Sequence, residues 1–283
     1  MKKINIMLSK WKGIAFALPS TLLIIVLFIY PFLLSFQRSF QLADDSYSLL
    51  NYVQSWERYS SDIFFTVFIS LVSLFILLLL SIILSGVLRL YSFAVVEFIF
   101  KIPLFVPYVV VGHAVRVFLA PHGTLTSLLN ALNIVNPDNL PQIAFSSAGL
   151  IFALVWKNLG ISLLLVLGSF RGVNQNMLEA AESMGASKYQ LVKDFLVPIC
   201  KSSFGVIAVL TFTSMMGSFS IPAMIGGGGG SQMLMIDVHQ QMIEQQNLGM
   251  ANAIGVFGYL FSMGATIYYL NGMGKGAETK YGS

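Results

Sequence analysis

Few side chains in this sequence could carry out chemistry on a bound substrate. The three histidines, His113, His122 and His239, lie far apart and lack the spacing of metal ligands. The single cysteine, Cys200, excludes an internal disulfide and an iron-sulfur cluster held by this chain alone. A membrane-embedded enzyme would need clustered His, Asp, Glu or Cys residues near the membrane face, and the sequence has no such cluster. We therefore expect no catalytic residues and no metal site.

The run Gly226–Gly230 is the segment whose composition most suggests phosphate binding. A nucleotide-binding loop needs a Lys followed by Ser or Thr in the right place, with a strand before it, and this run has neither. We interpret the run as a flexible outer turn. The chain is therefore not expected to hydrolyse ATP.

Four polar residues lie within or near apolar stretches and could line a path for a solute: Arg116, Lys157, Ser214 and Ser218. A charge inside a bilayer costs at least about 2.5 kcal/mol unless it faces water or a partner. Two cations that face a passage would favour an anionic solute. The alternatives are that Arg116 reaches the membrane interface and that the serines bond their own helix backbone.

Composition identifies the solvent of most of the chain as lipid. Of 283 residues, 56% are hydrophobic and 10% are charged, against roughly 25% charged in an ordinary soluble domain. The apolar residues come in runs of about 20, as in membrane helices, and not in the short alternating segments of a membrane β-barrel. We therefore predict an all-α polytopic membrane protein that forms a single transmembrane domain over residues 1–283.

Six apolar runs are near the ~20 residues that a membrane-spanning helix needs: residues 13–36, 63–88, 103–120, 147–170, 204–225 and 250–270. The first follows several lysines and resembles a signal peptide, but it is longer than the 7 to 15 apolar residues of such a peptide. We expect it to be a retained helix. The third run is short and contains Pro103 and Pro107.

The basic residues predict the orientation, because excess Lys and Arg mark cytoplasmic segments. With both termini in the cytoplasm, the outer segments contain Arg38 and Arg58 alone. The inner segments contain Lys2, Lys3, Lys10, Lys12, Arg89, Lys101, Arg171, Lys188, Lys193, Lys201, Lys275 and Lys280. This asymmetry predicts six spans with cytoplasmic termini and a long inner loop, residues 171–203.

The inner loop has the signals of two short helices joined at a glycine. Asn176 with Glu179, and Ser187 with Gln190, have the spacing of capping boxes at helix starts. Gly185 between them can adopt a left-handed backbone and change the direction of the chain. Pro198 is expected to end the second helix before the fifth span.

The first of these helices has a narrow apolar stripe made by Met177, Ala181 and Met184. Such a stripe could dock in a groove of a partner subunit. It could equally lie flat on the membrane interface. The physical pattern alone leaves both interpretations open.

The segment EAAESMGASKYQLVKDFLVP, residues 179–198, resembles the permease signature of ATP-binding cassette (ABC) importers. The signature is Glu, Ala, Ala, three residues, Gly, nine residues, and then an apolar, any, an apolar residue and Pro. Residues Glu179, Ala180, Ala181, Gly185 and Pro198 match it at the family's spacing. Phe195 and Val197 replace the usual Ile and Leu and keep the apolar character.

The resemblance implies that this loop is a coupling helix between spans four and five that docks on an ABC ATPase dimer. Its contact residues would be Glu179, Ala180, Ala181, Met184, Gly185 and Pro198. ATP and Mg would be bound by the ATPase, and this chain would need no cofactor. The other implied partners are a second permease subunit, identical or homologous, an extracytoplasmic solute-binding protein and the bilayer of a bacterial inner membrane. No nucleic-acid partner is expected.

Two further segments, SFSIPAMIGGGGG and FLAPHGTLTSLLN, resemble permeases of the polyamine, ferric iron, thiamine and aminoethylphosphonate group. The resemblance implies import of a small polar or charged solute: a polyamine, an anion such as a phosphonate, or ferric iron. The competing hypothesis is a secondary transporter driven by an ion gradient, without an ATPase. It would explain six spans and buried charges, but not the signature.

Overall fold

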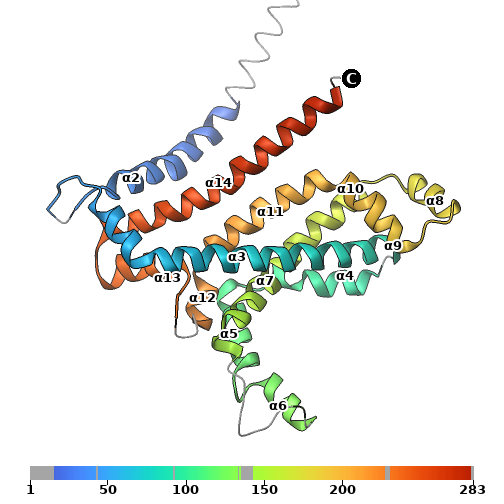
Figure 1. Cartoon of the computed structure of the whole chain (residues 1–283), viewed down its shortest axis with the longest axis horizontal. Coiled ribbons are helices and arrows are strands. Elements are labelled where there is room, and N and C mark those ends of the chain that lie inside the picture. Colours follow the sequence, from blue (N-terminus) through green and yellow to red (C-terminus); the bar gives the residue numbers. More distant parts are fainter. Residues whose placement is uncertain are drawn as a thin grey trace, which may run out of the picture. The chain divides into compact units, whose positions relative to one another are not determined.

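The structure is a computed structural model, and it describes residues 16–42, 44–91, 93–132, 134, 143–226 and 230–281. Over these residues the chain is helical, with one isolated antiparallel bridge between Gln41 and Tyr47 (Figure 1). The predicted all-helical class is confirmed. The chain divides into two compact units, and the boundaries fall within helices α3 (Leu50–Tyr91), α13 (Leu234–His239) and α14 (Leu248–Tyr281).

The first unit comprises Met1–Arg58 and Val238–Val256. It contains the helical stretch Phe16–Arg38, whose last part is α2 (Tyr30–Arg38), and the π-helix η5 (Gln240–Glu244). The buried Asn51 side chain donates to the backbone oxygens of Ser39 (3.0 Å) and Gln41 (2.9 Å). These bonds hold the turn after α2 against the start of α3.

The second unit comprises Tyr59–Asp237 and Phe257–Ser283. Its whole described helices are α4 (Ala94–Lys101), α5 (Tyr108–Leu119), α6 (Thr124–Ala131), α7 (Ser147–Arg171), α8 (Gln175–Ser183), α9 (Lys188–Gln190), α10 (Val197–Ile199), α11 (Lys201–Met216) and α12 (Ser220–Ile225). It also contains α3 from Tyr59, α13 up to Asp237 and α14 from Phe257. Short 3-10 turns lie at Ile102–Leu104 and Ile143–Phe145, and a π-helical turn lies at Leu191–Leu196. The core is centred on α7, because its leucines and alanines are buried along most of its length.

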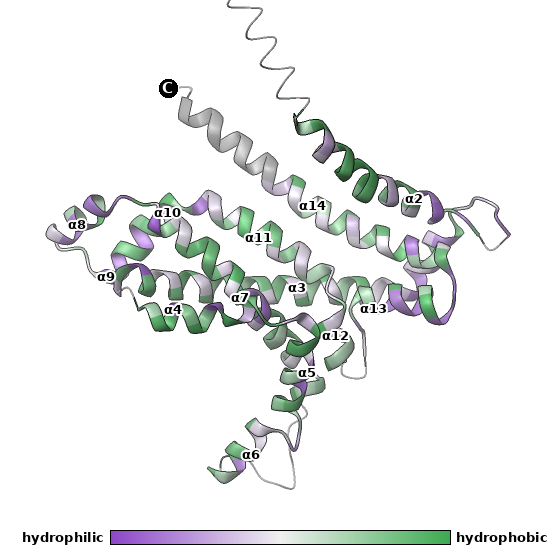
Figure 2. Ribbon diagram, turned by 180° about the vertical axis from the view of Figure 1, so that it is seen from behind, coloured by the Kyte–Doolittle hydropathy of each residue, from purple (hydrophilic) through white to green (hydrophobic). Residues whose placement is uncertain are grey.

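Four described helices are long and apolar enough to cross a membrane: Phe16–Arg38, Leu50–Tyr91, Ser147–Arg171 and Leu248–Tyr269. Two bent helix pairs raise the number to six if each pair is one span. In Figure 2 the apolar residues of α3, α4 and α7 colour these helices mainly green, whereas α8 mixes purple with green. The chain is therefore a multi-pass membrane protein with four to six candidate spans.

The third predicted span is broken. Ala94–Leu104 and Tyr108–Ala131 meet at an angle of 106°. Pro103 and Pro107 lie on either side of the break, and Pro107 is extended with ψ of 147°. A proline has no backbone N–H to donate, and its ring clashes with the preceding helical turn, so two prolines four residues apart stop a continuous helix here.

The fifth predicted span, residues 204–225, is also divided, between α11 and α12. Helix α11 ends at Met216, where Gly217 forms its C-cap, and α12 restarts at Ser220. Helix α11 in turn lies at 74° to the segment Lys188–Ile199 of the inner loop. The hydropathy pattern predicted the apolar run, but it did not predict the breaks in the helix within that run.

At Gly160 the backbone of α7 lies close to the broken third span. A Cβ atom at this position would lie 2.8 Å from the Leu104 Cγ atom and 3.2 Å from the Leu104 backbone nitrogen. The break between α4 and α5 therefore packs directly on the α7 backbone. A side chain at position 160 would force the two segments apart.

We predict that Gly160→Leu lowers the thermal stability of the purified chain by about 1 to 3 kcal/mol, the usual cost of overpacking. Gly168→Leu is the matched control on the same helix, because a Cβ atom at position 168 would have no neighbouring atom within 4 Å. The measurement is the apparent melting temperature in detergent. Equal losses in both variants would contradict the assigned close approach.

Candidate functional site

The inner loop makes its turn at Gly185, as predicted. Gly185 has a φ of 92°, in the left-handed region. The Ala186 N–H donates to the Ala181 oxygen (3.0 Å), and the Gly185 N–H donates to the Glu182 oxygen (2.9 Å). This is the hydrogen-bond pattern of a Schellman C-cap, which ends α8 and reverses the chain.

The two helix starts of the loop differ in how well the sequence predicted them. Ser187 and Gln190 form the predicted capping box, with bonds of 2.7 and 3.3 Å. The prediction that Asn176 caps the first helix is wrong. Asn174 is the N-cap, and its side chain accepts from the Asn176 N–H at 2.9 Å. The shift arises because an Asn two residues earlier offers the same capping oxygen.

The exposed surface of α8 and its C-cap combines polar residues with two methionines. Leu178 and Ala181 are buried against the rest of the unit, whereas Met184 is 81% exposed and Met177 is 37% exposed. The predicted stripe is thus divided: Ala181 faces inward, and the two methionines face outward. Two exposed methionines at a sharp turn suit contact with a partner subunit or with the membrane interface, the two alternatives that the sequence left open.

The remaining matched residues of the signature lie around this turn. Glu179 and Ala180 are exposed on α8, and Glu179 accepts a bond of 3.0 Å from the Gln175 side chain. Pro198 is exposed, but it does not end the second helix as predicted. The helix runs through Pro198 to Ile199.

The base of the loop is fixed to the membrane helices by charge and by packing. The Arg89 guanidinium of α3 donates to the backbone oxygens of Phe170 (3.0 Å) and Val173 (3.1 Å). Arg171 binds the Glu97 carboxylate of α4 with two nitrogens, at 2.6 and 3.1 Å. This network was not predicted from the sequence, in which its one signal is the position of each charge at the end of an apolar span.

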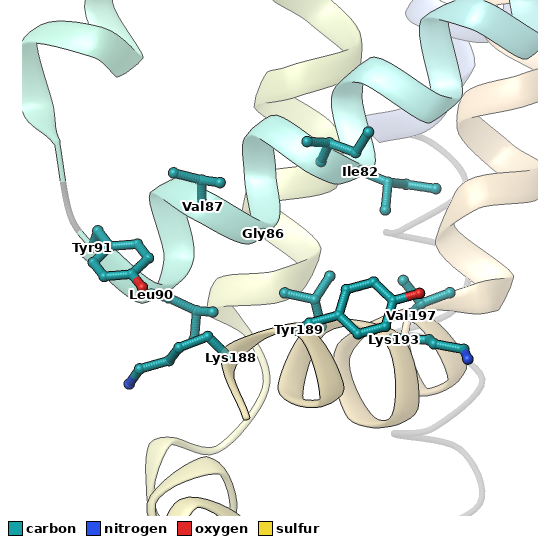
Figure 3. A pocket seen from close by; sticks show the side chains of 11 residues that line it. Ile82, Gly86, Val87, Leu90, Tyr91, Lys188, Tyr189, Lys193 and Val197 are labelled. Atoms are coloured by element: carbon teal, nitrogen blue, oxygen red, sulfur yellow. The ribbon is translucent and has the colours of Figure 1, made fainter. Parts of the chain in front are cut away.

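An apolar groove of about 360 Å³ separates the end of α3 from the second half of the loop (Figure 3). Figure 3 shows Ile82 and Val87 on the α3 side and Tyr189 and Val197 on the loop side. Gly86 allows the close approach, because a Cβ there would lie 2.9 Å from a Val192 methyl group. The loop helices therefore follow α3 closely.

Lys157 of α7 lies deep in the unit and holds the broken third span. Its ammonium donates to the backbone oxygens of Pro103 (2.8 Å) and Val106 (2.6 Å) and lies 4.6 Å from the centre of the Tyr108 ring. The residue is 8% exposed. The lysine thus satisfies carbonyl groups that the break deprives of their helical partners.

The other three residues predicted to line a path lie at different places. Ser214 of α11 lies 3.2 Å from the Tyr108 hydroxyl, so Tyr108 links it to the Lys157 site. Ser218 is buried, and its hydroxyl has no hydrogen-bond partner within the described part of the chain. Arg116 is exposed, donates to the Met224 oxygen (3.2 Å) and lies over the Phe145 ring. A role of these residues in a solute path stays a prediction.

Within the residues that the structure describes, no group of three or more His, Cys, Asp or Glu side chains could hold a metal ion. The site therefore offers hydrogen-bonding and apolar surfaces, and its geometry suits docking and movement of helices. Residues 227–229 of the glycine run lie outside the described residues, as do Lys2, Lys3, Lys10 and Lys12.

Curated proteins with similar sequences are transport permeases. The chain is 27% identical over 154 residues to the sulfoquinovosyl glycerol permease of Agrobacterium fabrum, covering 53% of this chain and 49% of that one. It is 29% identical over 126 residues to the molybdenum permease of Azotobacter vinelandii, covering 44% and 53%. It is 26% identical over 115 residues to a spermidine/putrescine permease of Salmonella typhi, covering 41% and 39%.

The homologues of this chain are ABC transporter permeases. The resemblance seen in residues 179–198 is thereby confirmed, and transporter permeases are not themselves enzymes. No protein-family model matches the chain. The chain spans about half the length of the curated ABC permeases that it matches.

The fold agrees with an ABC permease over nearly the whole chain. A bacterial ABC transporter that imports the acidic polysaccharide alginate matches with a TM-score of 0.75 and 17% identity, covering 97% of this chain and 99% of that one. A bacterial alginate ABC transporter in complex with a periplasmic protein bound to an alginate pentasaccharide matches with a TM-score of 0.75 and 17% identity, covering 94% of both chains. At this identity the match establishes the fold.

We predict that Gly185→Val loosens the turn after α8, because a β-branched residue at a φ of 92° is strained by about 1 to 2 kcal/mol. Gly185→Asn is the matched control, since Asn tolerates this conformation. Hydrogen exchange of residues 182–187 should accelerate roughly 5- to 30-fold in the Val variant, as this free energy implies. An equal increase in the Asn variant would show that the backbone conformation is not the cause.

We predict that Lys157→Met destabilises the chain even without solute, because each carbonyl left unpaired costs about 1 to 3 kcal/mol. Arg116→Met is the control, since Arg116 is exposed and bonds one carbonyl. Thermal unfolding in detergent is the measurement. If Lys157→Met unfolds at the wild-type temperature, the lysine does not hold the broken span.

Proposed function

We propose that this chain is the permease subunit of an ATP-driven, binding-protein-dependent importer and forms half of a translocation path. The observation that carries the proposal is the inner loop, in which α8 ends at a left-handed Gly185 beside the exposed Met184. Such a rigid turn with an apolar face suits insertion into a groove of another protein. The ABC permease homologues support the same assignment.

The partner at this loop would be an ABC ATPase dimer that binds ATP and Mg. The exposed signature residues Glu179, Ala180, Met184 and Gly185 would contact it, with Ala181 and Pro198 supporting the turn. Closure of the ATPase around ATP would push on α8. The Arg171–Glu97 pair and the Arg89 bonds at the base of the loop would pass this force to α4 and α3.

The remaining architecture follows from the same assignment. Six spans would place both termini in the cytoplasm of a bacterium, with the chain in the inner membrane and each bent pair contributing one crossing. A second permease subunit, identical or homologous, would complete the path. A solute-binding protein on the outer side would deliver the solute, as the periplasmic protein bound to the alginate transporter suggests.

The solute class stays broad in this proposal, a small polar or charged compound. The relatives are named for solutes as different as sulfoquinovosyl glycerol, molybdenum and polyamines. The polyamine, phosphonate and ferric iron assignments drawn from the sequence are therefore three candidates among several. A carrier driven by an ion gradient remains the competing hypothesis, and it would leave the exposed face of α8 without a partner.

The test is purification of the complex from its native membrane through a tag on this chain. We predict that an ABC ATPase co-purifies with wild type and that Met184→Asp reduces its recovery at least tenfold, because a charge then faces an apolar groove and costs at least about 1.4 kcal/mol. Met242→Asp is the matched control, an exposed methionine on η5. Stimulation of ATP hydrolysis should fall in the Met184 variant as well.

Two outcomes would contradict the proposal. Failure to recover any ATPase with wild type, together with uptake that follows an ion gradient, would favour the carrier. Equal loss of the ATPase in Met184→Asp and Met242→Asp would show that the effect is not specific to the α8 face.

A further inference from the structure

The segment that leads into α13 is docked on α3 by two side chains. The Gln232 N–H donates to the Asp62 carboxylate (2.9 Å), and the Leu234 N–H donates to the Thr66 hydroxyl (2.8 Å). Between them, Met233 is buried in the core cluster around α7. This segment follows the glycine run, and these contacts hold it against α3.

Asp237 completes the docking site from α13. One of its carboxylate oxygens accepts a hydrogen bond of 2.6 Å from the Gln232 side chain, and the residue is 1% exposed. Its second oxygen is buried and has no hydrogen-bond partner among the described residues. An ionised carboxylate in this position loses its hydration and has one hydrogen bond, from Gln232, to offset the loss.

The charges around Asp237 also oppose its ionisation. The Asp62 carboxylate acts on Asp237 as a like charge, and Gln232 is the group that favours the ionised form. Helix α12 and residues 248–269 of α14 carry no Asp, Glu, His, Lys or Arg. Asp62 of α3 is the charged group that acts on Asp237, and the charged or titratable residues nearest to these two in the sequence are Glu57 and Arg58 on α3 and His239 on α13.

Burial, followed by the Asp62 charge, raises the pKa of Asp237 to about 7 from its ordinary 3.8. A raised pKa means that the docked state binds the proton more tightly than the released state does. The proton therefore stabilises docking fully below pH 3.8, and this stabilisation is lost as the pH rises through about 7. The direction is opposite to that of a salt-bridged carboxylate.

We propose that Asp237 and Asp62 form a proton-dependent latch that docks residues 231–237 on α3 when Asp237 is protonated and weakens as it ionises. Protonation turns the unpaired oxygen into a hydroxyl and removes the repulsion between the two carboxylates. Asp62 keeps its bond to the Gln232 N–H in the docked state. The latch concerns this chain alone and goes beyond the proposed import function. If the import function is contradicted, the proposed latch still stands.

The test is hydrogen exchange of the full-length chain in lipid nanodiscs at pH 6 and pH 8.5, corrected for the intrinsic effect of pH on exchange. The docking equilibrium should weaken up to about tenfold per pH unit between pH 3.8 and about 7 and then level off, so the amides of Gln232 and Leu234 should lose roughly tenfold in protection between pH 6 and pH 8.5. Asp237→Asn should keep its protection at both pH values. Asp44→Asn, an exposed carboxylate that accepts from Ser46, should respond as wild type does.

Unchanged protection of the wild-type amides between the two pH values would overturn the latch, and so would a pH response that persists in Asp237→Asn. If the Asn variant fails to fold, a spin label at Ser231→Cys in a Cys200→Ala background gives a second measurement on otherwise intact chain. Ser231 is partly accessible at the start of the docked segment, and Cys200 is the single native cysteine. Label mobility should rise with a midpoint near pH 7, and a flat profile would reject the proposal.

Discussion

The bonds from Lys157 to the carbonyls of Pro103 and Val106 are the interaction on which the second unit depends. In lipid, an unsatisfied backbone carbonyl costs several kcal/mol, so a broken span persists only where protein groups replace the missing helical bonds. A long side chain with three donors on a neighbouring helix is well suited to that task. Gly160, one turn further along α7, allows the break to approach closely enough for the lysine to reach it.

The same principle organises the inner loop. A helix that stops at a sharp turn leaves carbonyl groups without partners, and the left-handed Gly185 allows the next two N–H groups to bond them. The capping box at Ser187 then starts the following helix. Because Asn174 caps the start of α8 and the Gly185 turn closes its end, the C-cap residue Met184 is held on a firm backbone. Arg89 and Arg171 anchor the base of the inner loop to α3 and α4. Movement of the loop would therefore be transmitted to these two helices.

The sequence predicted what depends on local residue types. The Gly185 turn, the Ser187 capping box and the fourth span, which is α7, follow from short-range patterns and were found in place. The cap at Asn174 was missed because two asparagines two residues apart offer equivalent oxygens. Features that depend on long-range geometry were not predictable. The Asp62–Gln232 bond joins residues 170 positions apart, and hydropathy measures composition without registering where a span bends.

The hydrogen bonds from Lys157 to two backbone carbonyls also bear on solute selection. The sequence suggested that two cations in a passage would favour an anion, but Lys157 is 8% exposed and uses its ammonium to bond two carbonyls behind the Tyr108 ring. The partly exposed group at this place is therefore the Tyr108 hydroxyl, which bonds Ser214 and can both donate and accept. A neutral hydroxyl pair discriminates weakly between anions and cations. Under the proposed import function, selectivity would therefore reside mainly in the solute-binding protein, which accords with similar permeases that are named for chemically different solutes.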